Sequence, residues 1–179
     1  HPSPIPRPPE GTGMERILIS ACLLGRPVRY NGTDKASGAD DILALWREQG
    51  RLVPVCPEIA VGFPTPRPAA EIYRSDGDPQ GANVLAGRAS VIEETGRNVT
   101  ALYVQAAQET VQLAQRNGCH HAVLTDGSPS CGSSFIYDGG FRGVTKPGVG
   151  TTTAALRAAG INVWPETRIA ALHALLGTP

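Results

Sequence analysis

Three cysteines in this chain each follow a short apolar run and lie among Gly, Pro, Ser or Ala. They are Cys22, Cys56 and Cys131. If the apolar runs are parallel strands of one sheet, the three thiols meet at its carboxyl edge, where open α/β sheets bind ligands. A single cysteine often only packs the core. Three that converge indicate a metal or cluster site.

The spacing of these cysteines leaves the kind of metal open. Structural zinc sites usually have paired Cys-x-x-Cys motifs and four ligands, whereas the cysteines here are single and far apart. Three thiolates suit a catalytic zinc with water as the fourth ligand. They suit equally a [4Fe–4S] cluster in which one iron has no protein ligand. The fourth cysteine, Cys119, falls at the opposite end of a predicted strand, and we expect an ordinary, partly buried thiol there.

Glu58 is the candidate general base. It lies two residues after Cys56, and Pro57 between them fixes one backbone angle, so the offset between thiol and carboxylate is rigid. A carboxylate beside a partly apolar metal pocket can accept a proton from water. The alternative is that Glu58 caps the following helix or pairs with an arginine.

Four further polar residues are candidates for the site. Ser128 and Ser130 precede Cys131, and either hydroxyl could orient substrate, relay a proton, or cap the loop backbone. Ser128 is the preferred catalytic candidate of the two, and Ser130 is a candidate substrate contact. Arg67 and Glu71 could contact substrate from a Pro-rich segment, although a structural Arg–Glu pair explains them equally well.

Short apolar runs alternate with helical patterns from residue 14 onward, which is typical of βαβ units. We therefore predict one three-layer, Rossmann-like α/β domain over residues 14–179, with a mainly parallel sheet. The predicted strands are 17–20, 52–55, 122–125 and 161–164, and the predicted helices are 41–49, 98–117, 151–159 and 167–176. Asp40 is expected to cap the first helix and Gly118 to end the longest. The apolar stripe of that longest helix is predicted to be Leu102, Val104, Ala106, Val111, Leu113 and Ala114.

Three segments rich in Gly and Pro have separate interpretations. Residues 1–13 are expected to be a disordered leader or a cloning remnant. Residues 62–87 are too long for a passive connector and are predicted to form a functional lid, with a small hairpin around residues 71–73. Residues 148–151 open a helix and resemble an anion-binding terminus, but no P-loop Gly-Lys-Ser/Thr follows.

Composition excludes several classes of function. Sixteen basic residues balance sixteen acidic ones, so the net charge of zero gives no footprint for long nucleic acid. No apolar run reaches the length of a membrane span. Four cysteines and no recognisable signal peptide favour a reducing cytoplasm.

At this point several motifs resemble those of the DUF523 family, which includes the thiouracil desulfidases. The match runs in order from about Met14 to the last predicted strand. The segments that carry it are Ser20–Gly25, Val28–Gly32, Val53–Glu58, Pro64–Arg67 and Ser128–Gly132.

The resemblance implies a [4Fe–4S] cluster held by Cys22, Cys56 and Cys131, with one iron left to bind the thiocarbonyl sulfur of a small thiolated heterocycle such as 2-thiouracil. The catalytic Glu and Ser of the family would fall on Glu58 and Ser128. The implied reaction is a non-redox exchange of C=S for C=O with release of hydrogen sulfide.

Two other classes of function use the same residues. The first is a zinc-dependent hydrolase built on the three thiols and Glu58, and the second is a non-enzymatic Fe–S or thiol redox sensor. A carboxylate beside a cysteine and a long lid favour turnover over sensing. Action on thiolated tRNA bases fits the chemistry but is opposed by the neutral charge.

Overall fold

The computed structural model describes residues 14–25, 39–74 and 80–177. The predicted leader, residues 1–13, and the motif at residues 28–32 lie outside these ranges.

The centre of the molecule is a four-stranded sheet in the order β2-β1-β5-β8. Its strands are β1 (Ile17–Ser20), β2 (Leu52–Val55), β5 (His121–Leu124) and β8 (Asn162–Pro165). All three pairings are parallel, as predicted. The last two strands are displaced from their predicted positions by one residue, a shift that apolar runs by themselves do not resolve.

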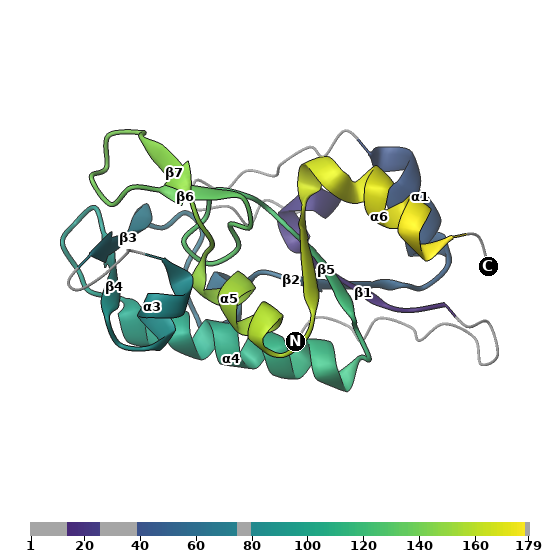
Figure 1. The fold of residues 1–179 in the computed structure, drawn as a ribbon, viewed down its shortest axis with the longest axis horizontal. Coiled ribbons are helices and arrows are strands. Elements are labelled where there is room, and N and C mark those ends of the chain that lie inside the picture. The colour runs from purple at the N-terminus through teal and green to yellow at the C-terminus, as the bar shows by residue number, and fades with distance from the viewer. Residues whose placement is uncertain (1–13, 26–38, 75–79, 178–179) are drawn as a thin grey trace.

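Helices cover both faces of this sheet, which confirms the three-layer α/β architecture (Figure 1). The helices of the first face are α1 (Asp40–Glu48) and α6 (Ile169–Leu176), and those of the second are α4 (Thr100–Arg116) and α5 (Thr151–Ala158). Alternate residues of a strand point to opposite faces. Ile17 and Ile19 therefore pack with Trp46 of α1, while Leu18 packs with Leu156 of α5.

Smaller elements lie at the carboxyl edge and at one end of the molecule. They are two 3₁₀ helices, η1 (Ala21–Leu24) and η2 (Glu166–Arg168), the helices α2 (Pro57–Ala60) and α3 (Gly81–Leu85), and two antiparallel strand pairs, β3 (Ala70–Arg74) with β4 (Ala89–Glu93) and β6 (Phe135–Tyr137) with β7 (Thr145–Pro147). The predicted hairpin around residues 71–73 corresponds to β3. The strands β4, β6 and β7 were not predicted, because short strands beside glycines give a weak period-two signal.

The predicted lid, residues 62–87, thus contains β3 and α3 where it is described. Its strand packs into a separate buried cluster with α3, β4 and the first turn of α4. The described part of the segment is therefore packed against the rest of the domain in this structure. No helix among the described residues is long and apolar enough to cross a membrane.

The predicted N-cap of the first helix was wrong. Asp40 is the first residue of α1 and not its cap; the N-cap is Ala39, which makes no side-chain cap hydrogen bond. The acidic side chain instead lies where the helix dipole favours negative charge.

The predicted apolar stripe of α4 was also displaced. The fully buried side chains are Tyr103, Ala106, Ala107, Thr110 and Ala114. Leu102, Val104, Val111 and Leu113 are only partly buried. Small residues dominate the buried face because α5 packs closely against it, so the largest apolar side chains were a poor guide. Gly118 follows this helix with φ +66°, as predicted for a helix end.

Candidate functional site

A cavity of about 450 Å³ opens at the carboxyl edge of the central sheet. Cys22, Cys56 and Cys131 all line it, together with Glu58. The structure therefore brings the three predicted thiols to one pocket. Their role as ligands remains a prediction.

Strand order explains why the thiols meet. The strands that precede the three cysteines, β2, β1 and β5, are neighbours in the sheet. From β1 the chain continues to β2 on one side of the sheet, and from β5 it continues to β8 on the other side. The order of the strands therefore reverses between β1 and β5, and a crevice forms at such a switch point. Cys22 lies in η1 directly after β1, and its Sγ is 2.8 Å from the hydroxyl of Thr125, which follows β5.

The loop that carries Cys131 is fixed to the amino end of α5. The N–H of Thr152 donates to the carbonyl oxygen of Ser130 at 2.9 Å, and the Thr153 hydroxyl donates to that of Cys131 at 3.0 Å. A Cβ on Gly150 would lie 2.5 Å from the Ser130 oxygen, so glycine is required for this approach. The helix end predicted to resemble an anion site is therefore occupied by loop carbonyls.

The two serines of this loop have different surroundings. The Ser128 hydroxyl oxygen accepts the N–H groups of Ser130 at 3.0 Å and Cys131 at 3.2 Å, so it caps the loop backbone while Ser128 also lines the pocket. Ser130 is fully buried, and its hydroxyl lies 3.3 Å from both Cys131 Sγ and Thr152 Oγ1. This burial does not fit the predicted contact between Ser130 and substrate. The hydroxyl instead orients the Cys131 thiol.

Glu58 lies in the first turn of α2 and is buried. Its Oε2 accepts a hydrogen bond from Arg67 Nη2 at 3.3 Å and one from Cys56 Sγ at 3.5 Å. The side chain does not cap α2, so of the alternatives the arginine pair is the one observed. Its other oxygen, Oε1, is buried without a hydrogen-bond partner in the described chain. Because an unpaired buried acceptor is costly, such an atom points to a functional site.

Arg67 and Glu71 both line the pocket, but they do not pair with each other. Arg67 binds Glu58. The Glu71 Oε1 accepts the N–H groups of Gly139 at 2.9 Å and Phe141 at 3.2 Å, and so holds the loop between β6 and β7 at the pocket. Both residues therefore shape the wall of the site.

The electrostatics of the pocket favour protonated thiols. Burial, and then the charge of Glu58, raise the pKa of Cys56 to about 12. Burial and Glu58 also raise the pKa of Cys131 well above its usual value; the Ser130 hydrogen bond opposes this, and Cys56 and Cys22 add to it. A metal or cluster would have to displace these protons to bind.

Across residues 14–25, 39–74 and 80–177, no three His, Cys, Asp or Glu side chains are placed to hold a single metal ion. The three thiols line a common space without meeting at one point.

Several lining residues were missed by sequence reasoning. Tyr103, Thr125, Asp126, Phe135, Tyr137 and Phe141 all line the pocket. Thr125 ends a predicted strand and Asp126 directly follows it, so their position at the carboxyl edge was a usable signal. Tyr103 lies on a helix whose buried face was assigned incorrectly, and no sequence signal placed it here.

Replacing Asp126 with alanine should lower the free energy of unfolding by about 1–3 kcal/mol at neutral pH. Its Oδ1 accepts backbone N–H groups from Gly127, Ser133, Ser134 and Phe135 at 2.9 to 3.2 Å. Burial by itself would raise the pKa of Asp126, but the N–H groups of Ser134 and the residues beside it outweigh burial and lower the pKa below its ordinary 3.8.

Because the folded-state pKa is lowered, this stabilisation is complete above pH 3.8 and is lost as the pH falls through the folded-state value. Urea unfolding of wild type and Asp126→Ala should therefore differ at pH 7 and converge in acid. Glu109→Ala, on the exposed face of α4, is the control and should change little. Equal midpoints for wild type and Asp126→Ala at pH 7 would refute the role of this carboxylate.

The fold and the pocket together define a class of protein: an α/β enzyme whose cysteine-lined site lies at the switch point of a parallel sheet. The chain belongs to the 2-thiouracil desulfurase family, whose model matches residues 17–168. It is therefore an enzyme of the class that cleaves carbon–sulfur bonds.

Two similar proteins support this assignment. The chain is 40% identical over 153 residues to the protein YbbK of Bacillus subtilis (strain 168). This match covers 86% of the chain and 97% of YbbK. The fold of the chain is similar to that of the solved [4Fe-4S]-dependent thiouracil desulfidase TudS, with a TM-score of 0.79 and 41% identity. That match covers 91% of this chain and 98% of TudS.

Proposed function

We propose that this chain is an iron–sulfur-dependent desulfidase that converts the thiocarbonyl of a small thiolated heterocycle, such as 2-thiouracil, to a carbonyl. The observation that carries the proposal is a single pocket lined by three thiols and by Glu58, a buried carboxylate with one unpaired oxygen. Similarity to TudS, whose name states [4Fe-4S] dependence, supports the choice of cofactor.

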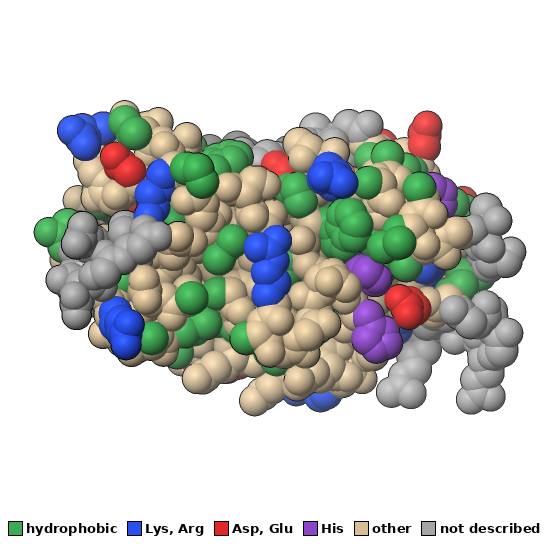
Figure 2. Space-filling model, in the orientation of Figure 1, with side chains coloured by type: hydrophobic (Ala, Val, Ile, Leu, Met, Phe, Trp, Pro, Cys, Tyr) green, Lys and Arg blue, Asp and Glu red, His purple; other side chains and the backbone are tan. Residues whose placement is uncertain are grey.

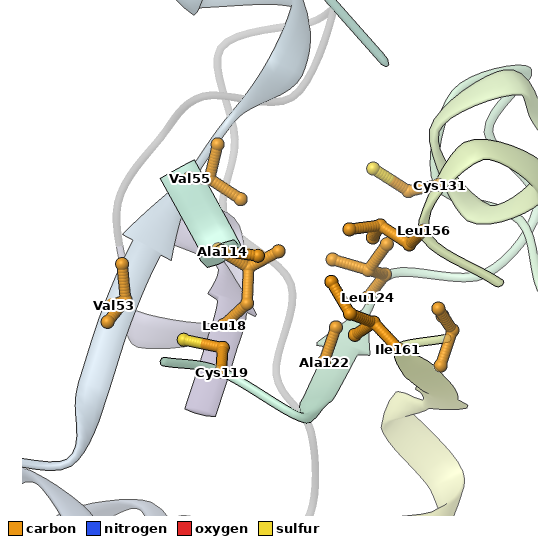
Figure 3. Close-up of a cluster of buried hydrophobic side chains, with 11 residues drawn as sticks. Leu18, Val53, Val55, Ala114, Cys119, Ala122, Leu124, Cys131, Leu156 and Ile161 are labelled. Carbon is orange, nitrogen blue, oxygen red and sulfur yellow. The ribbon is translucent and has the colours of Figure 1, made fainter. Parts of the chain in front are cut away.

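Cys22, Cys56 and Cys131 would hold a [4Fe–4S] cluster and leave one iron without a protein ligand. The donor set fits, because three thiols from three loops line one space. Figure 3 shows Cys119 and Cys131 at opposite ends of the same buried cluster, which argues against Cys119 as a fourth ligand. The similarity to TudS makes zinc the weaker alternative. When bound, the cluster supplies a Lewis-acidic iron that polarises a carbon–sulfur bond.

The reaction balances as a hydrolysis. The oxygen of water becomes the carbonyl oxygen, its two protons go to the departing sulfide as hydrogen sulfide, and no electrons are exchanged. Glu58 Oε1 is available to accept the first proton from water. The Arg67 guanidinium, bound to Oε2, holds the carboxylate in place.

A small molecule suits this pocket better than a long nucleic acid. The net charge is zero, and positive and negative side chains are interspersed on the face shown in Figure 2. Long nucleic acids are bound by concentrated positive charge. We place the enzyme in the cytoplasm, where a reducing environment keeps thiol ligands available.

The first test is the content of iron, acid-labile sulfide and zinc in anaerobically purified protein. We expect iron and sulfide near the stoichiometry of one cluster, and conversion of 2-thiouracil to uracil with equimolar hydrogen sulfide. Zinc without sulfide would support a hydrolase instead. Failure to bind either metal after anaerobic reconstitution would overturn the proposal.

A further inference from the structure

Tyr103 presents an unpaired hydroxyl group to the pocket. It lies in the first turn of α4, is only 5% exposed, and lines the cavity. Within the described chain this hydroxyl makes no hydrogen bond, yet it is not among the polar atoms sealed from solvent. Because so little of the residue is exposed, the pocket is where the hydroxyl can be reached.

The ring of Tyr103 is held in place from behind. Its centroid is 5.5 Å from that of Phe63, at an interplanar angle of 57°, and α2 packs against α4 so that Glu58 and Tyr103 face the same cavity. Burial first, and then the charge of Glu58, raise the pKa of Tyr103 well above its usual value. The phenol is therefore neutral in the working pH range and is a hydrogen-bond donor.

The pocket thus holds two unsatisfied polar groups of opposite character. Glu58 Oε1 can only accept when ionised, and the Tyr103 hydroxyl has a proton to donate. The proposed reaction uses the carboxylate for water and the thiols for the cluster. The phenol has no assignment in that chemistry. A buried tyrosine normally finds a partner for its hydroxyl, so a partner supplied by substrate is the simplest account.

We propose that Tyr103 is a substrate-binding residue whose hydroxyl donates a hydrogen bond to a ring carbonyl oxygen of the thiolated heterocycle. This rests on the proposed function. It narrows the substrate class to rings that carry a carbonyl group in addition to the thiocarbonyl. A site built to bond a polar group discriminates strongly against an analogue that lacks it.

The test is Tyr103→Phe, which removes only the hydroxyl. The probes are 2-thiouracil, which has the second carbonyl, and pyrimidine-2-thione, which lacks it. We expect the KM for 2-thiouracil to rise about tenfold with little change in kcat, in keeping with the loss of one neutral hydrogen bond. The inhibition constant of pyrimidine-2-thione, measured against 2-thiouracil turnover, should stay the same. Tyr73→Phe is the matched control, because Tyr73 is 55% exposed and is not among the pocket-lining residues.

The outcomes separate the two proposals. Wild-type enzyme that fails to convert 2-thiouracil, although its cluster is intact, refutes the proposed function and this inference with it. Active wild type with unchanged KM in Tyr103→Phe refutes the inference alone. Weaker binding of both probes, at unchanged iron content, would show that Tyr103 shapes the pocket without reading a carbonyl, and would also overturn it.

Discussion

Glu58→Gln should lower the rate of 2-thiouracil desulfuration by about 10²- to 10⁴-fold, the usual contribution of a positioned general base. Glutamine keeps the shape of the side chain but cannot accept a proton at Oε1, the atom that has no partner in the pocket. Iron and sulfide content should be unchanged, because the thiols are untouched. The measurement is steady-state kinetics on protein of matched cluster content.

This substitution also leaves the buried Arg67 without its counter-charge, which is destabilising by itself. Glu93→Gln is the control, since Glu93 is equally buried, pairs with Arg97 at 3.4 Å, and is not among the pocket-lining residues. Glu93→Gln removes the charge of a buried, arginine-paired carboxylate outside the pocket, so it reports the effect of that loss on stability. If Glu58→Gln retains full activity, Glu58 has no part in proton transfer. If Glu93→Gln loses as much, stability explains the effect.

Cys131→Ala should abolish nearly all binding of iron and acid-labile sulfide, whereas Cys119→Ala should leave both at the wild-type level. The two cysteines are a matched pair, because both are buried in the same apolar cluster, at 5% and 3% exposure. Truncating either therefore costs similar packing free energy. Only Cys131 lines the pocket, so the difference in iron content reports ligation and not folding.

The assay is elemental analysis and the visible absorption spectrum after anaerobic reconstitution, with circular dichroism to check the fold. Loss of iron from Cys119→Ala with retention in Cys131→Ala would reverse the ligand assignment. Equal loss from both variants, with intact folds, would mean that packing of this cluster and not ligation controls metal content.

The loop that carries Cys131 holds its thiol in a fixed position, as a ligand to a metal group requires. Carbonyl groups of its loop bond to the first turn of α5, and Ser128 and Ser130 fix the backbone and the thiol from within the loop. A ligand held on such a support loses little conformational entropy when it binds a metal group. The loop is thus preorganised for binding by its own hydrogen bonds.

Much of the fold could be predicted from the sequence. Four apolar runs separated by helical patterns identify the strands of a parallel sheet, because a strand buried on both faces must be apolar throughout. Since the carboxyl ends of parallel strands share one edge, the positions of Cys22, Cys56 and Cys131 after three such runs predicted their meeting. The family motifs in the same places led to the same class of enzyme.

What the sequence could not determine depends on contacts between segments that are far apart in the chain. Arg67 had two possible roles, a substrate contact or a structural pair with Glu71, and it pairs with Glu58. Both partners are plausible from charge and spacing, and only the packing of the chain around the pocket selects between them. Ser128 was preferred over Ser130 as the catalytic serine, but local rules did not show that Ser130 is buried against a thiol.

Tyr103 is the clearest case. Periodicity predicted the helix that carries it, but the buried face of that helix is set by how closely α5 and β3–β4 approach, which no local pattern encodes. The sequence by itself determined the four central strands and four main helices, their order along the chain, the three thiols at one edge and the family. The tertiary structure decided which carboxylate oxygen stays unpaired and which tyrosine lines the same pocket, because burial and hydrogen bonding are properties of the packed chain and not of its segments.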